Sequence, residues 1–154
     1  FGGRRSLLFH ETIDQAETTS SVLNELDVTH ALEHSRLRPE TRTTALRRFA
    51  SGAVDTLVTV RALDEGIDVP DANLALIYSG TMNARQRLQR AGRVVRPSGG
   101  GALLVSFLAR GTTEELQVGA RDAALFGSSR VNHLANWNPA APEATVAFLR
   151  SLAP

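Results

Sequence analysis

The chain has 154 residues, of which 42% are hydrophobic and 21% charged, and its formal net charge at pH 7 is +1. These values fit one globular domain with a buried core and exclude a disordered chain, which would combine low hydrophobicity with high net charge. The absence of cysteine excludes disulfide scaffolds, thiolate zinc sites and cysteine nucleophiles. All 17 basic residues are arginine, which excludes a Walker A lysine and lysine Schiff-base chemistry within the chain.

The first half of the chain alternates short apolar segments with segments of helical spacing. Residues 5–10 are a predicted buried strand, and residues 12–26 a helix that Thr12 can cap. A second strand is predicted at residues 28–32. A second helix follows at residues 40–50, with Pro39 at its start and Gly52 stopping it.

The alternation continues into the second half and then changes character. Apolar strands alternating with helices indicate an α/β fold, a doubly wound parallel sheet flanked by helices, whose functional residues gather at the carboxyl ends of the strands. We expect a main domain at residues 1–111 and a helical C-terminal extension at residues 112–154. The remaining predicted elements are strands at residues 55–60, 73–79 and 102–108, and helices at residues 84–95, 114–126 and 144–152, the last preceded by a connector at residues 127–142.

Five arginines and no acid occupy the twelve residues 85–96. Gln89, Arg93 and Arg96 are separated by four and three residues, so a helix would bring them to one face. Guanidinium groups without carboxylates among them favour an external anion, and arginine binds phosphate through paired hydrogen bonds. This spacing predicts a phosphate-binding face; the alternative is a solvated basic face, or arginines paired with acids elsewhere in the fold.

The predicted strand at residues 55–60 runs directly into a loop at residues 61–71 that contains four acids, a glycine and a proline. Asp64 and Glu65 could suggest a divalent metal, but nothing shows that the two carboxylates converge, and Mg²⁺ usually also needs a substrate phosphate. We therefore expect no metal site within the chain. Asp68 is better interpreted as a hydrogen-bond acceptor for a hydroxyl or an arginine.

Four segments match a known set of motifs in their amino-acid sequence and in their order along the chain. Residues 89–96 are Gln-Arg-x-Gly-Arg-x-x-Arg, and residues 59–70 run from Thr59 to Glu-Gly-Ile-Asp-Val-Pro. Residues 7–12 are Leu-Leu-Phe-His-Glu-Thr, and residues 34–37 are His-Ser-Arg-Leu, followed by Arg42, Phe49 and Gly52.

Together these segments resemble the C-terminal RecA-like lobe of superfamily-two helicases of the DEAD/DEAH type. Residues 89–96 are similar to motif VI, residues 59–70 to motif V, and residues 7–12 stand at the place of motif IV. The resemblance covers residues 5–111 and implies a RecA-like lobe of the P-loop-NTPase type. It implies half of an enzyme, in which ATP lies between this lobe and an N-terminal lobe that supplies the Walker A lysine, Mg²⁺ and the catalytic acid.

By residue match, the resemblance implies an ATP-facing set of residues. Arg93 and Arg96 would be arginine fingers that reach the γ-phosphate, and Gln89 would position the water or the γ-phosphate. Gly66 and Asp68 would approach the nucleotide, with Asp68 on the ribose. Such fingers suit phosphoryl transfer, which depends on positioning and charge neutralisation.

The resemblance also implies a nucleic-acid-facing set. Thr59 would meet the nucleic-acid backbone, with help from His10 and Arg36. Arg42 would do likewise or would be structural. The expected partners are therefore DNA or RNA, the N-terminal RecA-like lobe of the same parent protein, and in some assemblies further protein subunits.

Several residues differ from the motif sequences of DEAD-box helicases. These differences favour the superfamily-two members that act on DNA, such as Rad25-type repair translocases and restriction-type motor subunits. Val94-Val95 replaces Thr-Gly, Gln89 replaces a histidine, and Asp64-Glu65-Gly66 replaces Ala-Arg-Gly. Ser35 stands where many relatives have glycine. The chain is thus predicted to be the second motor lobe of an ATP-dependent helicase or translocase that acts on nucleic acid, DNA rather than RNA.

The sequence allows two rival interpretations. The lobe could be degenerate, retained for docking to nucleic acid or protein without turnover. A small-molecule enzyme of the Rossmann type would need a Gly-x-Gly-x-x-Gly after the first strand, which residues 9–12 do not provide. We further expect a cytoplasmic protein without membrane contact, a chain that is part of a longer protein, and no ATPase activity in the chain alone.

Overall fold

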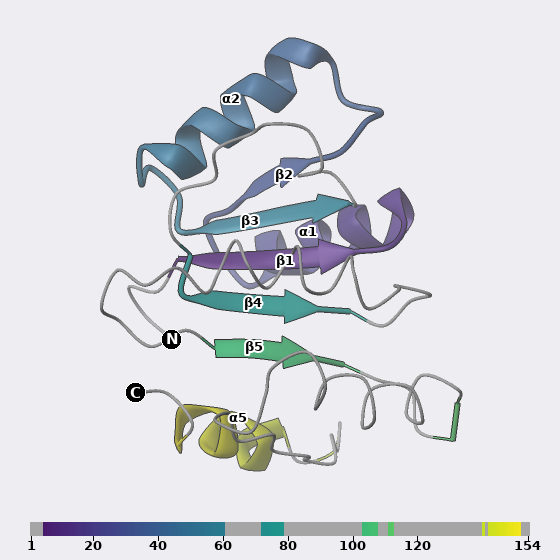
Figure 1. The fold of residues 1–154 in the computed structure, drawn as a ribbon, viewed down its shortest axis with the longest axis vertical. Coiled ribbons are helices and arrows are strands. Elements are labelled where there is room, and N and C mark those ends of the chain that lie inside the picture. Colours follow the sequence, from purple (N-terminus) through teal and green to yellow (C-terminus); the bar gives the residue numbers. More distant parts are fainter. Residues whose placement is uncertain are drawn as a thin grey trace, which may run out of the picture.

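The structure is a computed structural model, and it describes residues 5–60, 72–78, 103–107, 111–112, 140 and 142–151. Five parallel strands form one sheet in the order β2-β3-β1-β4-β5 (Figure 1), which confirms the predicted parallel α/β sheet. The strands are β1 (Ser6–His10), β2 (Ala31–Glu33), β3 (Thr56–Val60), β4 (Leu74–Ile77) and β5 (Leu103–Ser106), and the helices are α1 (Ile13–Glu25), α2 (Pro39–Ala50) and α5 (Pro142–Ser151).

Side chains alternate between the two faces of the sheet, and a helix covers each face. Leu7 and Phe9 of β1 pack with Phe49 of α2 on one face. Leu8 of β1 packs with Ala16 of α1 on the other face, and Figure 1 shows α1 behind the sheet. Strands covered on both sides need continuous apolar runs, and this explains why β1 is buried along its whole length.

Strand β2 differs from its predicted position at residues 28–32, because the chain turns before the strand begins. Asp27 has φ 53°, and the Val28 N–H donates to the Leu23 carbonyl at 2.8 Å, which closes the end of α1. The strand therefore starts only at Ala31 and extends to Glu33, one residue beyond its predicted end. The prediction for this strand was wrong by about three residues at its start.

The other predicted elements within the described residues are confirmed to within two residues. Helix α2 starts at Pro39, and Gly52 behind it has φ +74°, a conformation that suits glycine. Helix α5 starts at Pro142, two residues before the predicted start. None of the helices in these described segments is long and apolar enough to cross a bilayer. The predicted helices at 84–95 and 114–126 lie outside the described residues, and the boundary at residue 111 stays a prediction.

The turn from β1 into α1 is held by a capping box. Thr12 Oγ1 accepts a hydrogen bond from the Gln15 N–H at 3.3 Å, and Gln15 Oε1 accepts from the Thr12 N–H, also at 3.3 Å. Gln15 Oε1 also accepts from the Glu11 N–H. These bonds satisfy backbone donors that the first turn of a helix leaves free. They also fix the direction in which the chain leaves His10.

We predict that Thr12→Ala lowers the free energy of unfolding by about 1 kcal/mol, because it removes the N-cap acceptor. Urea unfolding followed by circular dichroism measures the change. Thr18→Ala in the same helix is the matched control, since the Thr18 hydroxyl only donates to the Asp14 carbonyl within the helix. Equal stability of the two variants would contradict the capping role.

Candidate functional site

The carboxyl ends of all five strands meet at one edge of the sheet, because every pair is parallel. This edge carries polar and aromatic side chains next to the apolar core. Its members are His10 at the end of β1, Glu33 at the end of β2, Thr59 in β3, Tyr78 after β4 and Phe107 after β5. In parallel α/β sheets, binding sites form at this edge.

A buried carboxylate joins two of the predicted nucleic-acid residues. Glu33 and Thr59 are register partners on β2 and β3, so their side chains lie on the same face of the sheet. The Thr59 hydroxyl donates to Glu33 Oε2 at 2.8 Å, and Arg42 Nε of α2 donates to Glu33 Oε1, also at 2.8 Å. One carboxylate thus connects two strands and a helix through its two oxygens. We call Thr59, Glu33 and Arg42 the Glu33 triad.

Because the Glu33 carboxylate is buried, the Glu33 triad is stable only when both of its partners are present. The side chain of Glu33 is 0% exposed, whereas that of Arg42 is 34% exposed. A carboxylate taken out of water needs both a counter-charge and hydrogen bonds, and removing one partner of a buried ion pair typically costs about 3–5 kcal/mol. Arg42 therefore has a structural role, and its side chain remains partly exposed to solvent.

A row of three rings lies along the other part of the edge. The His10 and Tyr78 rings stack with centroids 4.5 Å apart and planes 15° apart, and Tyr78 stacks on Phe107 at 5.0 Å and 19°. Neither ring nitrogen of His10 has a hydrogen-bond partner among the described residues. The row connects β1, β4 and β5 on the face of the sheet that α1 covers, where Tyr78 packs against the core.

Burial also decides the charge of His10. The residue is 2% exposed, and this desolvation lowers the pKa of its imidazole from 6.5 to about 4. Burial likewise raises the pKa of the Tyr78 phenol. The His10 ring is therefore neutral at pH 7 and carries no positive charge.

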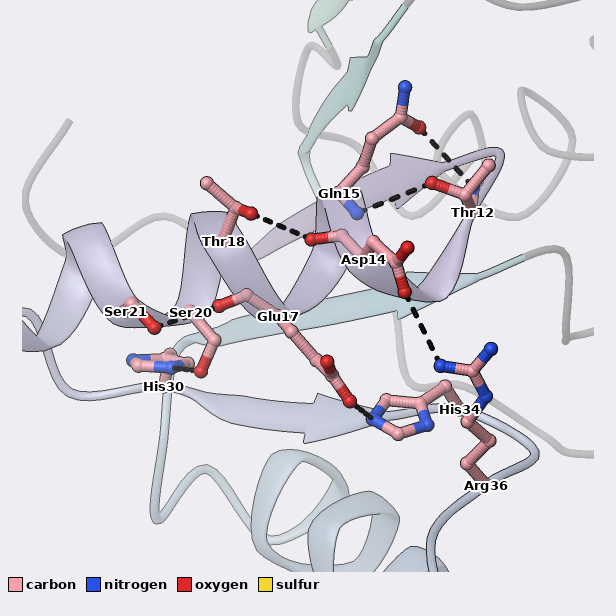
Figure 2. A network of polar contacts seen from close by, with 10 residues as sticks. All are labelled: Thr12, Asp14, Gln15, Glu17, Thr18, Ser20, Ser21, His30, His34 and Arg36. Carbon is pink, nitrogen blue, oxygen red and sulfur yellow. Dashed lines mark hydrogen bonds and ion pairs between the residues drawn. The ribbon is translucent and has the colours of Figure 1, made fainter.

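A set of polar contacts joins α1 to the chain around β2 (Figure 2). Arg36 Nη1 lies 3.3 Å from Asp14 Oδ1, and the two side chains are 68% and 83% exposed. Such exposed pairs contribute little to stability, so Arg36 can leave Asp14 for another anion. Deeper in the same network, the buried His34 has Nε2 3.4 Å from Glu17 Oε1.

Ser20 and His30 anchor the start of β2 in this network. The Ser20 hydroxyl and His30 Nε2 are 2.6 Å apart, and His30 Nδ1 lies 2.9 Å from the Val28 carbonyl oxygen. These contacts hold the turn that delays the start of the strand. They therefore help to fix the register that brings Glu33 beside Thr59.

The structure brings some predicted site residues together and separates others. Thr59 and Arg42 meet through Glu33 on the α2 face. His10 points to the α1 face, because its neighbour Phe9 packs with α2. Arg36 lies on the α1 side as well, through its contact with Asp14. The predicted ATP-facing residues, Gly66, Asp68, Gln89, Arg93 and Arg96, lie outside the described residues.

Three residues of this edge escaped the sequence analysis. Glu33 lies just beyond the predicted strand at residues 28–32, and Tyr78 and Phe107 lie inside predicted strands, so none of the three is a predicted site residue. Phe107 is only partly buried and stacks on Tyr78. A single acid or aromatic residue at the end of an apolar run is the only signal that the sequence offers for them. In the part of the chain that the structure describes, no group of three or more His, Asp or Glu side chains could hold a metal ion.

Comparisons with known proteins agree with this geometry. The family model "Helicase conserved C-terminal domain" matches residues 2–98. Over 112 residues the chain is 42% identical to a putative DNA 3'-5' helicase Rad25 of Haloarcula marismortui, a match that covers 72% of this chain and 17% of that protein. Over 94 residues it is 30% identical to a probable ATP-dependent RNA helicase, ddx49, of Dictyostelium discoideum, covering 61% of this chain and 18% of that protein. The chain thus spans less than a fifth of the length of these relatives.

A solved structure supports the fold. The chain superimposes on S. cerevisiae Dbp5 bound to RNA and ADP BeF3 with a TM-score of 0.74 at 19% identity, over 97% of this chain and 38% of that one. At this identity the likeness concerns the fold alone.

We predict that His10 makes stability fall as the solution is acidified from about pH 6.5 to about pH 4. The unfolded chain, with an ordinary histidine pKa of 6.5, binds a proton in this window, and the folded chain with a pKa of about 4 does not. Urea unfolding at several pH values measures the effect as the difference between the wild type and His10→Phe, which keeps a ring in the row. An identical pH slope in the two proteins would contradict the prediction.

Proposed function

This chain belongs to the helicase conserved C-terminal domain family as the C-terminal lobe of a superfamily-two helicase, and we propose that it is the second motor lobe of an ATP-dependent helicase or translocase that acts on DNA. The observation that carries this proposal is the family match over residues 2–98, which includes every predicted site residue. The parallel sheet supports it, because its carboxyl edge holds the described members of that set.

The proposed division of labour follows from the chemistry of phosphoryl transfer. In this proposal an N-terminal lobe holds ATP and Mg²⁺. The C-terminal lobe described here closes over the γ-phosphate, with Arg93 and Arg96 as arginine fingers. Gln89 positions the attacking water, and Gly66 and Asp68 approach the nucleotide. Positive charge at the transferred group stabilises the transition state, so the fingers act only when both lobes meet.

The nucleic-acid contacts are proposed for the edge that carries His10, Thr59, Arg36 and Arg42. The side chains of Arg36 and Arg42 are exposed and partly exposed, and their guanidinium groups suit phosphate oxygens. With a formal net charge of only +1, the chain has no large excess of positive charge that would bind the strand tightly. This moderate grip suits a motor that must release the strand in each cycle, because each phosphate contact adds to affinity.

We propose DNA rather than RNA as the preferred nucleic acid for two reasons. The relative named as a DNA helicase is 42% identical, whereas the one named as an RNA helicase is 30% identical. In addition, Gln89 and Val94-Val95 replace the residues common in DEAD-box RNA helicases.

We predict that the chain alone hydrolyses ATP only at background level, because it has no lysine and no Walker A loop. The same lobe joined to its N-terminal lobe should hydrolyse ATP, and single-stranded DNA should stimulate the rate more than RNA of equal length. A coupled phosphate-release assay measures all three rates. Robust turnover by the chain alone would refute the two-lobe proposal.

We predict that Arg93→Ala or Arg96→Ala in the two-lobe protein reduces the rate of ATP hydrolysis about 10³-fold, the lower end of arginine-finger effects, and leaves ATP binding nearly unchanged. Phosphate release and the binding of a fluorescent ATP analogue measure the two properties. Arg87→Ala in the same segment is the matched control. A degenerate docking lobe would show no difference between these variants and the control.

A further inference from the structure

We propose that Glu33 is a positioning residue, which orients the guanidinium group of Arg42 toward a nucleic-acid phosphate, and that Thr59 acts through Glu33 rather than by touching the strand. The inference rests on the proposed nucleic-acid function. It goes further by assigning a role to Glu33 and by changing the role expected of Thr59.

The hydroxyl proton of Thr59 is already engaged in a hydrogen bond. A threonine hydroxyl carries one donor, and that of Thr59 donates to Glu33 Oε2 at 2.8 Å. Phosphate oxygens only accept, so this hydroxyl cannot donate to a phosphate while the bond to Glu33 stands. The residue is also 0% exposed. Thr59 is therefore well placed to hold the carboxylate and poorly placed to hold the strand.

Arg42 has the opposite arrangement. Its Nε donates inward to Glu33 Oε1, and this leaves the two terminal nitrogens of a planar group with five N–H donors. Among the described residues, no acid pairs with these terminal nitrogens. A guanidinium held by Nε presents its outer edge as a fork, the geometry that binds two phosphate oxygens.

The contrast with Arg36 shows what the Glu33 triad adds. Arg36 uses a terminal nitrogen, Nη1, for an exposed acid, so phosphate would compete with Asp14 for the same fork. Arg42 is held by a fully buried acid through the nitrogen that a fork does not need. A side chain fixed before binding loses less conformational entropy when the strand arrives.

Magnetic resonance of the 154-residue chain tests the proposal. The Arg42 Nε–Hε signal, identified by its loss in Arg42→Lys, should exchange slowly with water, and titration with the oligonucleotide dT10 should shift the signals around Arg42. Thr59→Val should speed the exchange of this signal and weaken dT10 binding about fivefold, the scale of one hydrogen bond. Thr59→Ser should rescue both properties. Thr56→Val, at the other end of β3, is the matched control.

Glu33→Gln supplies a second variant that keeps the shape of the side chain. A glutamine has one carbonyl oxygen, so it cannot accept from Thr59 and Arg42 in the arrangement seen here. We expect the same loss as in Thr59→Val. The double variant Arg42→Lys/Thr59→Val should bind dT10 no more weakly than Arg42→Lys alone, because Thr59 acts only through Arg42.

Three results would overturn the proposal. If the losses of dT10 binding in Thr59→Val and Arg42→Lys multiply in the double variant, Thr59 touches the strand itself. Unchanged exchange of the Arg42 signal in Thr59→Val and Glu33→Gln would show that the carboxylate does not hold the guanidinium group. A protected Arg42 signal with no response to dT10 in the wild type would instead refute the nucleic-acid function on which the inference rests.

Discussion

Parallel pairing of β1 with both β3 and β4 is the constraint on which the arrangement of the candidate site depends. It brings residues separated by long stretches of sequence to one edge. There His10 ends β1, Thr59 lies next to the end of β3, and Tyr78 follows β4. The same ladder fixes the alternation of side chains, so consecutive residues serve different faces. The side chains at this edge are therefore divided between the two surfaces of one sheet.

On the α2 face, hydrogen bonding and charge dominate. Glu33 joins Thr59 and Arg42 in a buried unit that orders one guanidinium group. On the α1 face, ring stacking dominates: His10, Tyr78 and Phe107 connect three strands without a charge at neutral pH.

Local sequence signals predicted most of the fold. Continuous apolar runs identified four of the five strands, and the Thr12 cap, Pro39 and Gly52 identified the limits of α1 and α2, because these signals depend only on near neighbours. The start of β2 and the role of Glu33 could not be predicted in this way. They depend on a turn held by contacts between α1 and His30, and on a register between strands 26 residues apart. The motif resemblance named Thr59 and Arg42 but not the carboxylate between them.

The neutral ring of His10 has a consequence for how ionic strength acts on this lobe. Salt screens interactions between charged groups, so the stacking of the buried, uncharged His10 ring on Tyr78 should not depend on ionic strength. The exposed pair of Arg36 and Asp14 should weaken as salt is added. The contacts on the α1 side would thus differ among themselves in sensitivity to the electrolyte.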